Sequence, residues 1–225
     1  MRINKWIAGQ MGIGRRTVDE LILHGNVVVN GQIATIAQQI DGTEQIVVNG
    51  KPIATKSPDS ATLLLHKPVG YVCSRNGQGS KTVYDLLPAE YEDLKIAGRL
   101  DRDSSGLVVM SRNGDMIQEL SHPSQDKKKT YRITTRRPLT TEELDKIQNA
   151  GVDIGDDRLS RFSITPTGED CTYIAVLTEG RNRQIRRTIE ALHTHVQSLQ
   201  RTHLGPYSLD NLDEGAYQLI DSHTS

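Results

Sequence analysis

The stretch AGRLDRDSSGLVVMSRNGD, residues 97–115, places charged side chains directly before a strongly apolar run. Arginine and aspartate alternate over residues 99–103, and the run at residues 107–110 is typical of a buried strand. A carboxylate held at the mouth of a core can act as a nucleophile or stabilise developing positive charge. A guanidinium beside it would keep it ionised, because an opposing cation lowers an Asp pKa by ~1–3 units. This stretch is therefore the first candidate for a catalytic site.

Two other segments concentrate positive charge, although the chain as a whole has a net charge of −1. KKKTYRITTRR (residues 127–137) and RNRQIRR (residues 181–187) contain no acidic residue, while acidic residues gather in TEELD (141–145) and DIGDD (153–157). Such segregation indicates a positive face on a neutral body, which favours RNA as a partner. A single charge run would be equally compatible with a solvated surface.

The elements around these segments divide the chain in two. Apolar spacing predicts helices near residues 3–11 and 15–23, and strands at 27–29 and 46–48, each of which ends at an Asn-Gly pair typical of hairpins. The composition of ATKSPDSA, residues 54–61, predicts a linker. We therefore expect a small α/β domain over residues 1–55 and a larger domain over residues 62–225.

The larger segment mixes strands and helices without a regular βαβ rhythm, which predicts an α+β domain whose mixed, mainly antiparallel sheet is flanked by helices. Thr140 and Glu143 have the spacing of a capping box at a helix start. The expected strands are residues 63–65, 107–110, 131–134, 162–164 and 173–177, and the expected helices are residues 115–120, 141–148 and 184–192.

Composition narrows the class of protein further. The chain has 225 residues and two cysteines, neither of them in a CxxC motif, so we expect neither a disulfide framework nor a zinc site. Apolar runs are far too short for a membrane span, and the N-terminus lacks the apolar core of a signal peptide. We expect a cytoplasmic protein that has no membrane partner and acts as a monomer.

Several segments, taken in order, resemble the motifs of the RsuA-like family of ribosomal RNA pseudouridine synthases. GRLDRDSSGL resembles the GRLDxxxxGL signature of that family, and EGRNRQIRR (residues 179–187) resembles its third motif. Lys67-Pro68 with Gly70 resembles the first motif, and Lys129-Thr130-Tyr131 resembles the KxY motif. Residues 2–31 resemble an S-four-type RNA-binding domain. The resemblance covers nearly the whole chain.

The resemblance implies an isomerase that converts a specific uridine of ribosomal RNA to pseudouridine. Asp101 would be the nucleophile that attacks the sugar carbon, and Arg186 would form an ion pair with it, with Arg187 as the second choice. Tyr131 would pack on a uracil that has been flipped out of the RNA helix. Large-subunit ribosomal RNA is our first choice of substrate and small-subunit RNA the second, either free or in a ribosomal subunit precursor.

The remaining implied contacts are with the RNA backbone, which positions an RNA without reading its sequence. No metal is expected, because His193 and His195 are two residues apart and have no obvious third ligand. No cofactor is expected either, since the isomerisation has no net redox change. The expected RNA-binding residues are Arg2, Lys5, Arg15, Arg16, Arg99, Lys129, Arg181, Arg183 and Arg187.

Three positions depart from the pattern of the family. Gly14 stands where the RNA-binding domain usually has Ser, Thr188 where the family often has Met, and His193 where it usually has Gly. His adopts the left-handed conformation less readily than Gly, so the end of that helix is expected to differ. None of the three is the candidate nucleophile.

Two alternatives from other classes remain open at this point. A non-catalytic RNA-binding or ribosome-assembly protein could use the same two domains, although it would not need Asp101, Tyr131 and Arg186 together. A glycoside hydrolase would need a second carboxyl group as its acid. Asp103 is only two residues from Asp101, and the basic runs favour RNA over a sugar.

Overall fold

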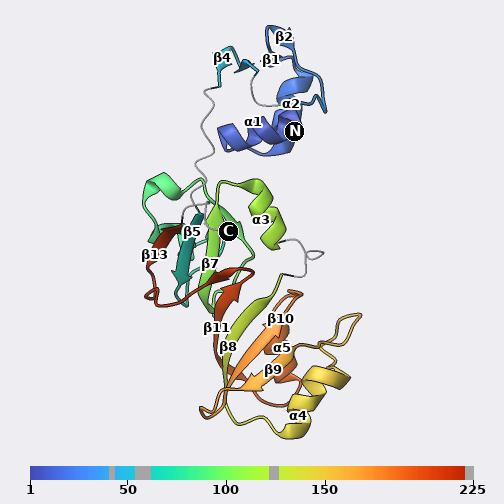
Figure 1. Cartoon of the computed structure of the whole chain (residues 1–225), viewed down its shortest axis with the longest axis vertical. Coiled ribbons are helices and arrows are strands. Elements are labelled where there is room, and N and C mark those ends of the chain that lie inside the picture. The colour runs from blue at the N-terminus through green and yellow to red at the C-terminus, as the bar shows by residue number, and fades with distance from the viewer. Residues whose placement is uncertain (41–43, 54–61, 122–126, 221–225) are drawn as a thin grey trace. The chain divides into compact units, whose positions relative to one another are not determined.

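The computed structural model describes residues 1–40, 44–53, 62–121 and 127–220 (Figure 1). Contacts divide the chain into two compact units, residues 1–60 with 112–114 and residues 61–111 with 115–225. The linker expected at residues 54–61 lies outside the described residues. Within the described ranges, no helix has the length and apolar character needed to cross a membrane.

In the N-terminal unit, two helices and a four-stranded antiparallel sheet share one apolar core. Both expected helices are present, and Gly12 ends the first one with a left-handed φ of 68°. Asn30-Gly31 and Asn49-Gly50 adopt positive φ at both residues and close two hairpins, as predicted. The elements are α1 (Ile3–Met11), α2 (Arg15–Leu23), β1 (Val27–Val29), β2 (Gln32–Ile33), β3 (Ile46–Val48) and β4 (Lys51–Pro52), with the strand order β2-β1-β3-β4.

The second unit is built on a sheet with the strand order β13-β5-β7-β11-β8-β10-β9, to which β6 and β12 add at β7 and β11. Among the described strand pairs of this sheet, β11 and β7 are parallel and the others are antiparallel, so the predicted mixed, mainly antiparallel α+β fold is confirmed. The strands are β5 (Thr62–Lys67), β6 (Lys95–Ala97), β7 (Ser105–Ser111), β8 (Lys129–Thr135), β9 (Ser163–Pro166), β10 (Thr172–Leu177), β11 (Val196–Leu204), β12 (Tyr207–Ser208) and β13 (Tyr217–Ile220).

The helices of this unit follow the predicted positions, with differences at their ends. The predicted capping box of Thr140 and Glu143 starts α4, but the helix continues as a π-helical turn and not as a regular α-helix. The last helix ends at Glu190, before the predicted residue 192, and His193 then adopts a left-handed φ of 58°. The helices are α3 (Gly114–Ser121), α4 (Thr141–Asp145), η4 (Lys146–Ala150) and α5 (Gln184–Glu190), with short 3-10 helices η1 (Val83–Leu86) and η2 (Ala89–Tyr91).

Strand β7 is the central support of the fold, as the apolar run at residues 107–110 predicted. Leu107 and Val109 pack into one apolar cluster, and Val108 and Met110 pack into another, so both faces of the strand are covered. A strand buried on both sides holds whatever precedes it in a fixed position. The acidic loop at residues 101–104 precedes it directly.

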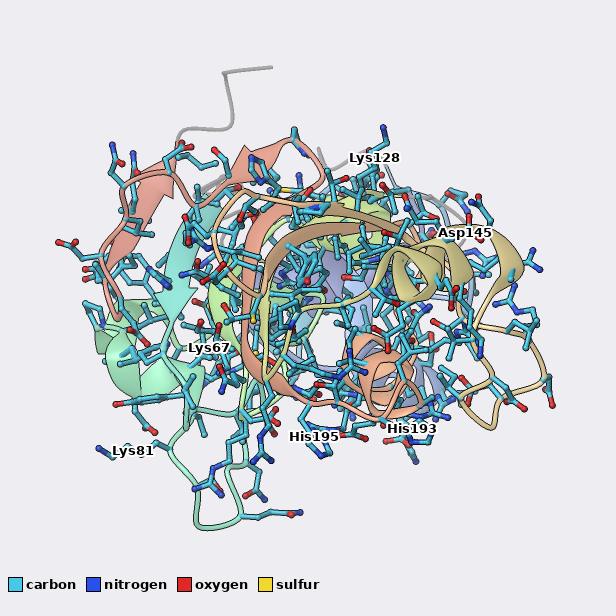
Figure 2. All side chains as sticks on the ribbon, turned by 90° about the horizontal axis from the view of Figure 1, so that it is seen from below. Lys67, Lys81, Lys128, Asp145, His193 and His195 are labelled. Carbon is cyan, nitrogen blue, oxygen red and sulfur yellow. The ribbon has the colours of Figure 1, made fainter. Side chains whose placement is uncertain are left out.

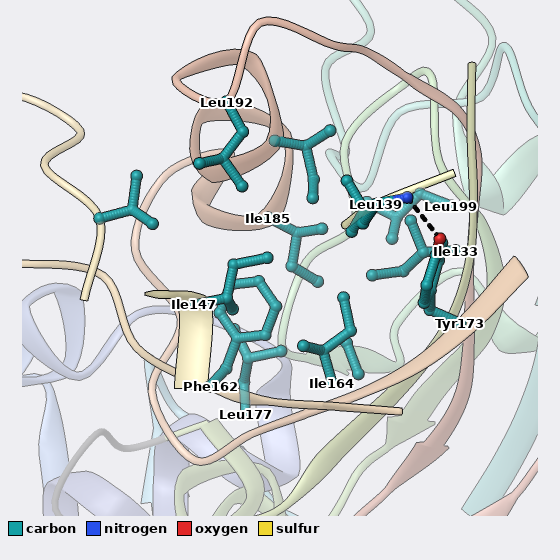
Figure 3. Packing of buried hydrophobic residues seen from close by; sticks show 13 residues of the cluster. Ile133, Leu139, Ile147, Phe162, Ile164, Tyr173, Leu177, Ile185, Leu192 and Leu199 are labelled. Carbon is teal, nitrogen blue, oxygen red and sulfur yellow. Dashed lines mark hydrogen bonds between the residues drawn. The ribbon is translucent and has the colours of Figure 1, made fainter. Parts of the chain in front are cut away.

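A third apolar cluster fills the space between helix α5 and the strands β8, β9 and β10 (Figure 3). The backbone N–H of Leu139 donates a hydrogen bond of 2.7 Å to the hydroxyl of Tyr173 in this core. Tyr131 on β8 packs against both this cluster and the one under β5 and β7. Its ring is therefore held at the junction of two cores.

Candidate active site

A cavity of about 540 Å³ opens where the acidic loop, β8, β11 and the start of α5 meet. It collects residues that lie far apart in the sequence, because the parallel pair of β7 and β11 brings the two halves of this unit together. Among the residues that line it are Asp101, Lys129, Tyr131, Arg183, Leu199 and Arg201. The acidic loop and the KxY segment, which the sequence identified separately, thus share one cavity.

Asp101 is held by a turn and remains accessible. Its carbonyl oxygen accepts a hydrogen bond of 3.2 Å from the backbone N–H of Ser104, which closes the loop. Its side chain is 36% exposed, and the nearest cation is Arg183, whose Nη1 lies 3.6 Å from Oδ2. A partly exposed carboxylate with one cation beside it is free to meet a substrate in the cavity.

The cation of Asp101 is not the one that we expected. The Arg186 guanidinium lies against Asp103, with Nε 3.3 Å from Oδ2 and Nη2 donating to the Asp103 carbonyl at 2.7 Å. Arg186 is 6% exposed and also reaches Ser104 Oγ at 3.3 Å. The expected Arg186–Asp101 ion pair is therefore replaced by an Arg186–Asp103 pair, because Asp103 lies closer to α5 and Arg183 occupies the side of Asp101.

Arg183 and Asp103 form the strongest ion pair of the site. Arg183 donates two parallel hydrogen bonds, of 2.9 and 2.8 Å, to the two oxygens of Asp103. Hydrogen bonding by Arg183 and the charge of Arg186 hold the pKa of Asp103 below its usual value, against the opposing effect of its burial. Arg183 itself adopts a left-handed φ of 48°, an unfavourable conformation that places its guanidinium between the two aspartates.

Replacing Asp103 by Asn should destabilise the protein by about 2 kcal/mol at neutral pH. This is less than the ~3–5 kcal/mol typical of a fully buried pair, because the Asp103 side chain is 45% exposed. Because its pKa is lowered on folding, the stabilisation is complete above the unfolded pKa of ~3.9 and is lost as the pH falls through the folded value. Urea unfolding of both proteins at several pH values should give curves that converge at acid pH; a constant gap would contradict the assignment.

The acidic loop also contacts the first motif, Lys67-Pro68 with Gly70, on the side opposite α5. Lys67 is fully buried, and its Nζ donates to the carbonyl oxygens of Pro68 at 2.7 Å and Ser104 at 2.6 Å (Figure 2). Burial lowers the pKa of the Lys67 ammonium, and the charges of Asp103 and Asp101 oppose that effect. The backbone N–H of Gly70 also donates to the Arg102 carbonyl at 2.7 Å. The loop is thus clamped between the end of β5 and α5.

Tyr131 and Lys129 line the cavity from β8. Tyr131 is half-buried and pairs in register with Arg201 on β11 and Ala175 on β10. Lys129 Nζ lies 3.3 Å from the Thr178 carbonyl, at the rim. An aromatic ring on one wall and a carboxylate on another are what a flipped base would need.

The predicted RNA-binding arginines of this unit differ in how they are engaged. Arg99 is exposed on the cavity and has no hydrogen-bond or ion-pair partner among the described residues. Arg181 and Arg187 both pair with Asp156, at 3.3 and 2.7 Å, and so brace the loop before β9. That Arg181 and Arg187 contact phosphate stays a prediction. In the structure the guanidinium groups of both are bound to acceptors of the protein itself.

The predicted RNA-binding residues of the N-terminal unit lie on or near its two helices. Arg15 and Arg16 begin α2 and are exposed, Arg2 is exposed at the residue before α1, and Lys5 is half-buried. Positive charge at the start of α2 is unfavourable for the helix dipole, which favours a role outside helix stability. Their contact with RNA stays a prediction.

The histidines at positions 66, 193 and 195 lie in different surroundings. His193 and His195 are both exposed after α5 (Figure 2), and His66 is buried with Nδ1 2.7 Å from the Leu212 carbonyl. Among the described residues, no group of three or more His, Cys, Asp or Glu could hold a metal ion.

Several cavity residues were not predicted from the sequence. Leu199 and Arg201 were missed because strand β11, which carries them, was not predicted at all. Burial in β11 is interrupted by two register shifts, so the period of two is weak. One sequence signal could have found them. Leu199 and Arg201 are two residues apart and so lie on the same face of a strand, where the charged Arg201 takes a position expected to be apolar.

Residues 61–191 match the RNA pseudouridylate synthase family, and residues 1–47 match the S4 domain, the S-four-type module named above. The family match spans most of the chain, and the chain therefore belongs to the RNA pseudouridylate synthase family. This confirms the resemblance that the motifs carried.

The similar proteins agree with that membership. Ribosomal large subunit pseudouridine synthase B of Pseudomonas aeruginosa is 32% identical, over 96% of this chain and 58% of its own length. The dual-specificity RNA pseudouridine synthase RluF of Escherichia coli K12 is 31% identical, over 97% of this chain and 74% of its own length. A crystal structure of a pseudouridylate synthase is 27% identical and matches with a TM-score of 0.70 over 98% of this chain and 96% of that one. The chain thus spans only part of the length of the first two relatives.

Proposed function

We propose that this protein isomerises a specific uridine of ribosomal RNA to pseudouridine. The observation that carries the proposal is the placement of Asp101 in one cavity with Tyr131, from segments 30 residues apart in a chain of this family. The name of the Pseudomonas aeruginosa relative supports large-subunit ribosomal RNA as the first choice of substrate, and that of the Escherichia coli relative supports RNA. Small-subunit ribosomal RNA is our second choice. Residues 62–225 would form the catalytic domain and residues 1–55 the RNA-binding domain of a cytoplasmic monomer.

The chemistry assigns roles to the cavity residues. Asp101 supplies an electron pair or a negative charge to the sugar carbon as the glycosidic bond breaks. Tyr131 packs on the base, which offsets the few kcal/mol that flipping costs. Arg186, which we expected to pair with Asp101 directly, acts through the loop, because it holds Asp103 and Ser104 in place.

The proposed RNA contacts follow from exposure and charge. Arg99 and Lys129 at the cavity would hold the phosphates next to the flipped nucleotide, and Arg183 would join them from the rim. In the N-terminal unit, Arg2, Lys5, Arg15 and Arg16 would position the RNA without reading its sequence. Arg181 and Arg187 would contribute only if they left Asp156.

Release of tritium from ribosomal RNA labelled at C5 of uracil tests the proposal, because pseudouridine forms through that carbon. Purified protein should release tritium from protein-free large-subunit RNA or from an assembly precursor, and small-subunit RNA serves as the comparison. Mapping of pseudouridines in cells with and without the protein would then locate the site. Tight RNA binding without tritium release from any of these RNAs would identify a non-catalytic RNA-binding protein and refute the proposal.

A further inference from the structure

Arg201 is a buried arginine that the roles assigned above do not use. It lies on β11, is 1% exposed and is among the largest fully buried side chains of the protein. Its Nε donates to the Leu107 carbonyl at 2.8 Å, and its Nη2 donates to the Gly98 carbonyl at 3.0 Å. Two of its three nitrogens therefore hold the first part of β7 and the first residue of the GRLD motif.

The third nitrogen, Nη1, is the part of the guanidinium that remains available to a ligand. It makes no hydrogen bond with any described residue, yet it is not among the side-chain atoms that are sealed from solvent without a partner. Arg201 lines the cavity, so the opening that Nη1 reaches is the cavity itself. A β-carbon built on Gly98 would lie 3.5 Å from Nη1, which indicates that the glycine leaves this side of the guanidinium open.

The charge of Arg201 has no acidic partner in the described part of the chain, where no carboxylate lies within ion-pair distance of it. Burying an unpaired cation is costly, and proteins keep such groups where a ligand supplies the missing charge. Arg181, Arg183, Arg186 and Arg187, by contrast, each pair with a carboxylate. Among the described residues Arg99 also lacks a carboxylate partner, but it is exposed, whereas Arg201 is a buried cavity arginine whose charge is left for a ligand to balance.

Its position favours the base over a phosphate as that ligand. Arg201 is directly opposite Tyr131 in the antiparallel pair of β11 and β8, so the two side chains project from the same face of the sheet. Arg183, which is 39% exposed, occupies the rim where a phosphate would pass. The Arg201 guanidinium is almost fully buried and lies beside the Tyr131 ring, on which the base would pack. It would therefore meet the edge of the base.

We propose that Arg201 Nη1 donates a hydrogen bond to a carbonyl oxygen of the flipped uracil and stabilises the negative charge that this base carries on leaving. The inference rests on the proposed function. When the bond from the sugar carbon to N1 breaks, its electron pair stays on uracil, where the charge spreads over both carbonyl oxygens. A preorganised donor aimed at developing charge is among the largest contributions that a protein makes to catalysis.

The remaining steps of the isomerisation need no further reactant, because every bond, electron pair and proton is accounted for. Asp101 supplies the electron pair, or the counter-charge, at the sugar carbon. After the uracil anion rotates, C5 bonds to the sugar carbon and Asp101 is released with its electrons. One proton then leaves C5, and one is taken up at N1, so the product is an isomer of the substrate. Arg201 contacts the base throughout and exchanges no proton.

The test compares uridine with 5-fluorouridine at the target position in single-turnover reactions at saturating RNA. Fluorine stabilises the uracil anion by induction, so bond cleavage should depend less on an external donor. Loss of the substrate nucleoside, measured after digestion of the RNA, reports cleavage for both. We expect Arg201→Met to slow the reaction of uridine ~100–1000-fold, as loss of an oxyanion donor does. With 5-fluorouridine the factor should be at least about tenfold smaller.

Two further variants separate a contact with uracil from a structural role. Lys67→Met removes another fully buried cation, which donates hydrogen bonds to the backbone carbonyls of Pro68 and Ser104, so its rate loss should be equal for the two RNAs. Arg201→Lys keeps the charge, so its rate loss should be smaller than that of Arg201→Met. The loss should again be larger for uridine than for 5-fluorouridine. It carries the comparison if Arg201→Met does not fold.

Equal factors for uridine and 5-fluorouridine in the Arg201 variants would overturn the inference and leave Arg201 as a purely structural residue. Unchanged rates would overturn it as well. A wild-type protein that converts neither RNA would refute the proposed function itself, and that result is visible before any variant is compared.

Discussion

Replacing Asp101 by Asn will lower the single-turnover rate of pseudouridine formation at least ~1000-fold, which corresponds to ~4 kcal/mol of lost transition-state stabilisation. Asn keeps the shape of the side chain and cannot supply the electron pair. The fold should be unaffected, because Arg183 retains its two hydrogen bonds to Asp103 and the loop is closed by the backbone of Asp101 and Ser104. RNA affinity should change by less than about threefold, since phosphate contacts dominate binding.

Asp103→Asn is the matched control, because it removes the neighbouring carboxylate from the same loop. It should reduce stability and slow the reaction, but it should not abolish turnover. Residual activity of Asp101→Asn above a thousandth of wild type, or a larger rate loss in Asp103→Asn, would show that the nucleophile has been assigned to the wrong residue.

Replacing Arg186 by Met will slow the reaction at least ~100-fold, although it will lower stability by only about 1 kcal/mol. The stability cost is small because the carboxylate left behind, Asp103, is half-exposed and keeps Arg183. The rate cost is large because the bonds from Arg186 to the Asp103 carbonyl and Ser104 Oγ disappear. A displacement of the reacting group by ~1 Å can cost about 100-fold. Urea unfolding and single-turnover kinetics measure the two effects separately.

Arg187→Met provides the comparison from the next residue of α5, whose guanidinium pairs with Asp156 away from the acidic loop. It should cost less than about tenfold in rate, because no bond to the loop is lost. If Arg187→Met slows the reaction as much as Arg186→Met, the helix and not the loop contact is responsible.

Local signals predicted the supports of the site well. The apolar run at residues 107–110, which follows the acidic loop, is the fully buried part of strand β7, and the Asn-Gly pairs close hairpins. Each of these depends on residues within about ten positions of one another, where periodicity and turn chemistry are informative. The capping box of Thr140 and Glu143 belongs to the same class.

The errors concern contacts between distant segments. Asp101 and Asp103 are two residues apart, and only the three-dimensional position of α5 decides which of them meets Arg186. Strand β11 was missed because its partners β7 and β8 are set by tertiary pairing, and its own alternation is broken by bulges and by Arg201. The order of the motifs indicated the family of the chain, but which residues pair with one another could be seen only in the structure.

The parallel pairing of β7 with β11 has a consequence for the order in which the protein becomes competent during synthesis. Contacts from Arg201 to Leu107 and Gly98 span 94 and 103 residues, and that from Arg186 to Asp103 spans 83. At ~5–20 residues per second, a ribosome needs about 5–20 s to add such a segment. During that interval the nascent chain carries its carboxylates without their arginines, while the helices of the N-terminal unit are already synthesised. Under the proposed function, RNA contact through that unit would precede any isomerisation, because the cavity is assembled only after β11 has been synthesised.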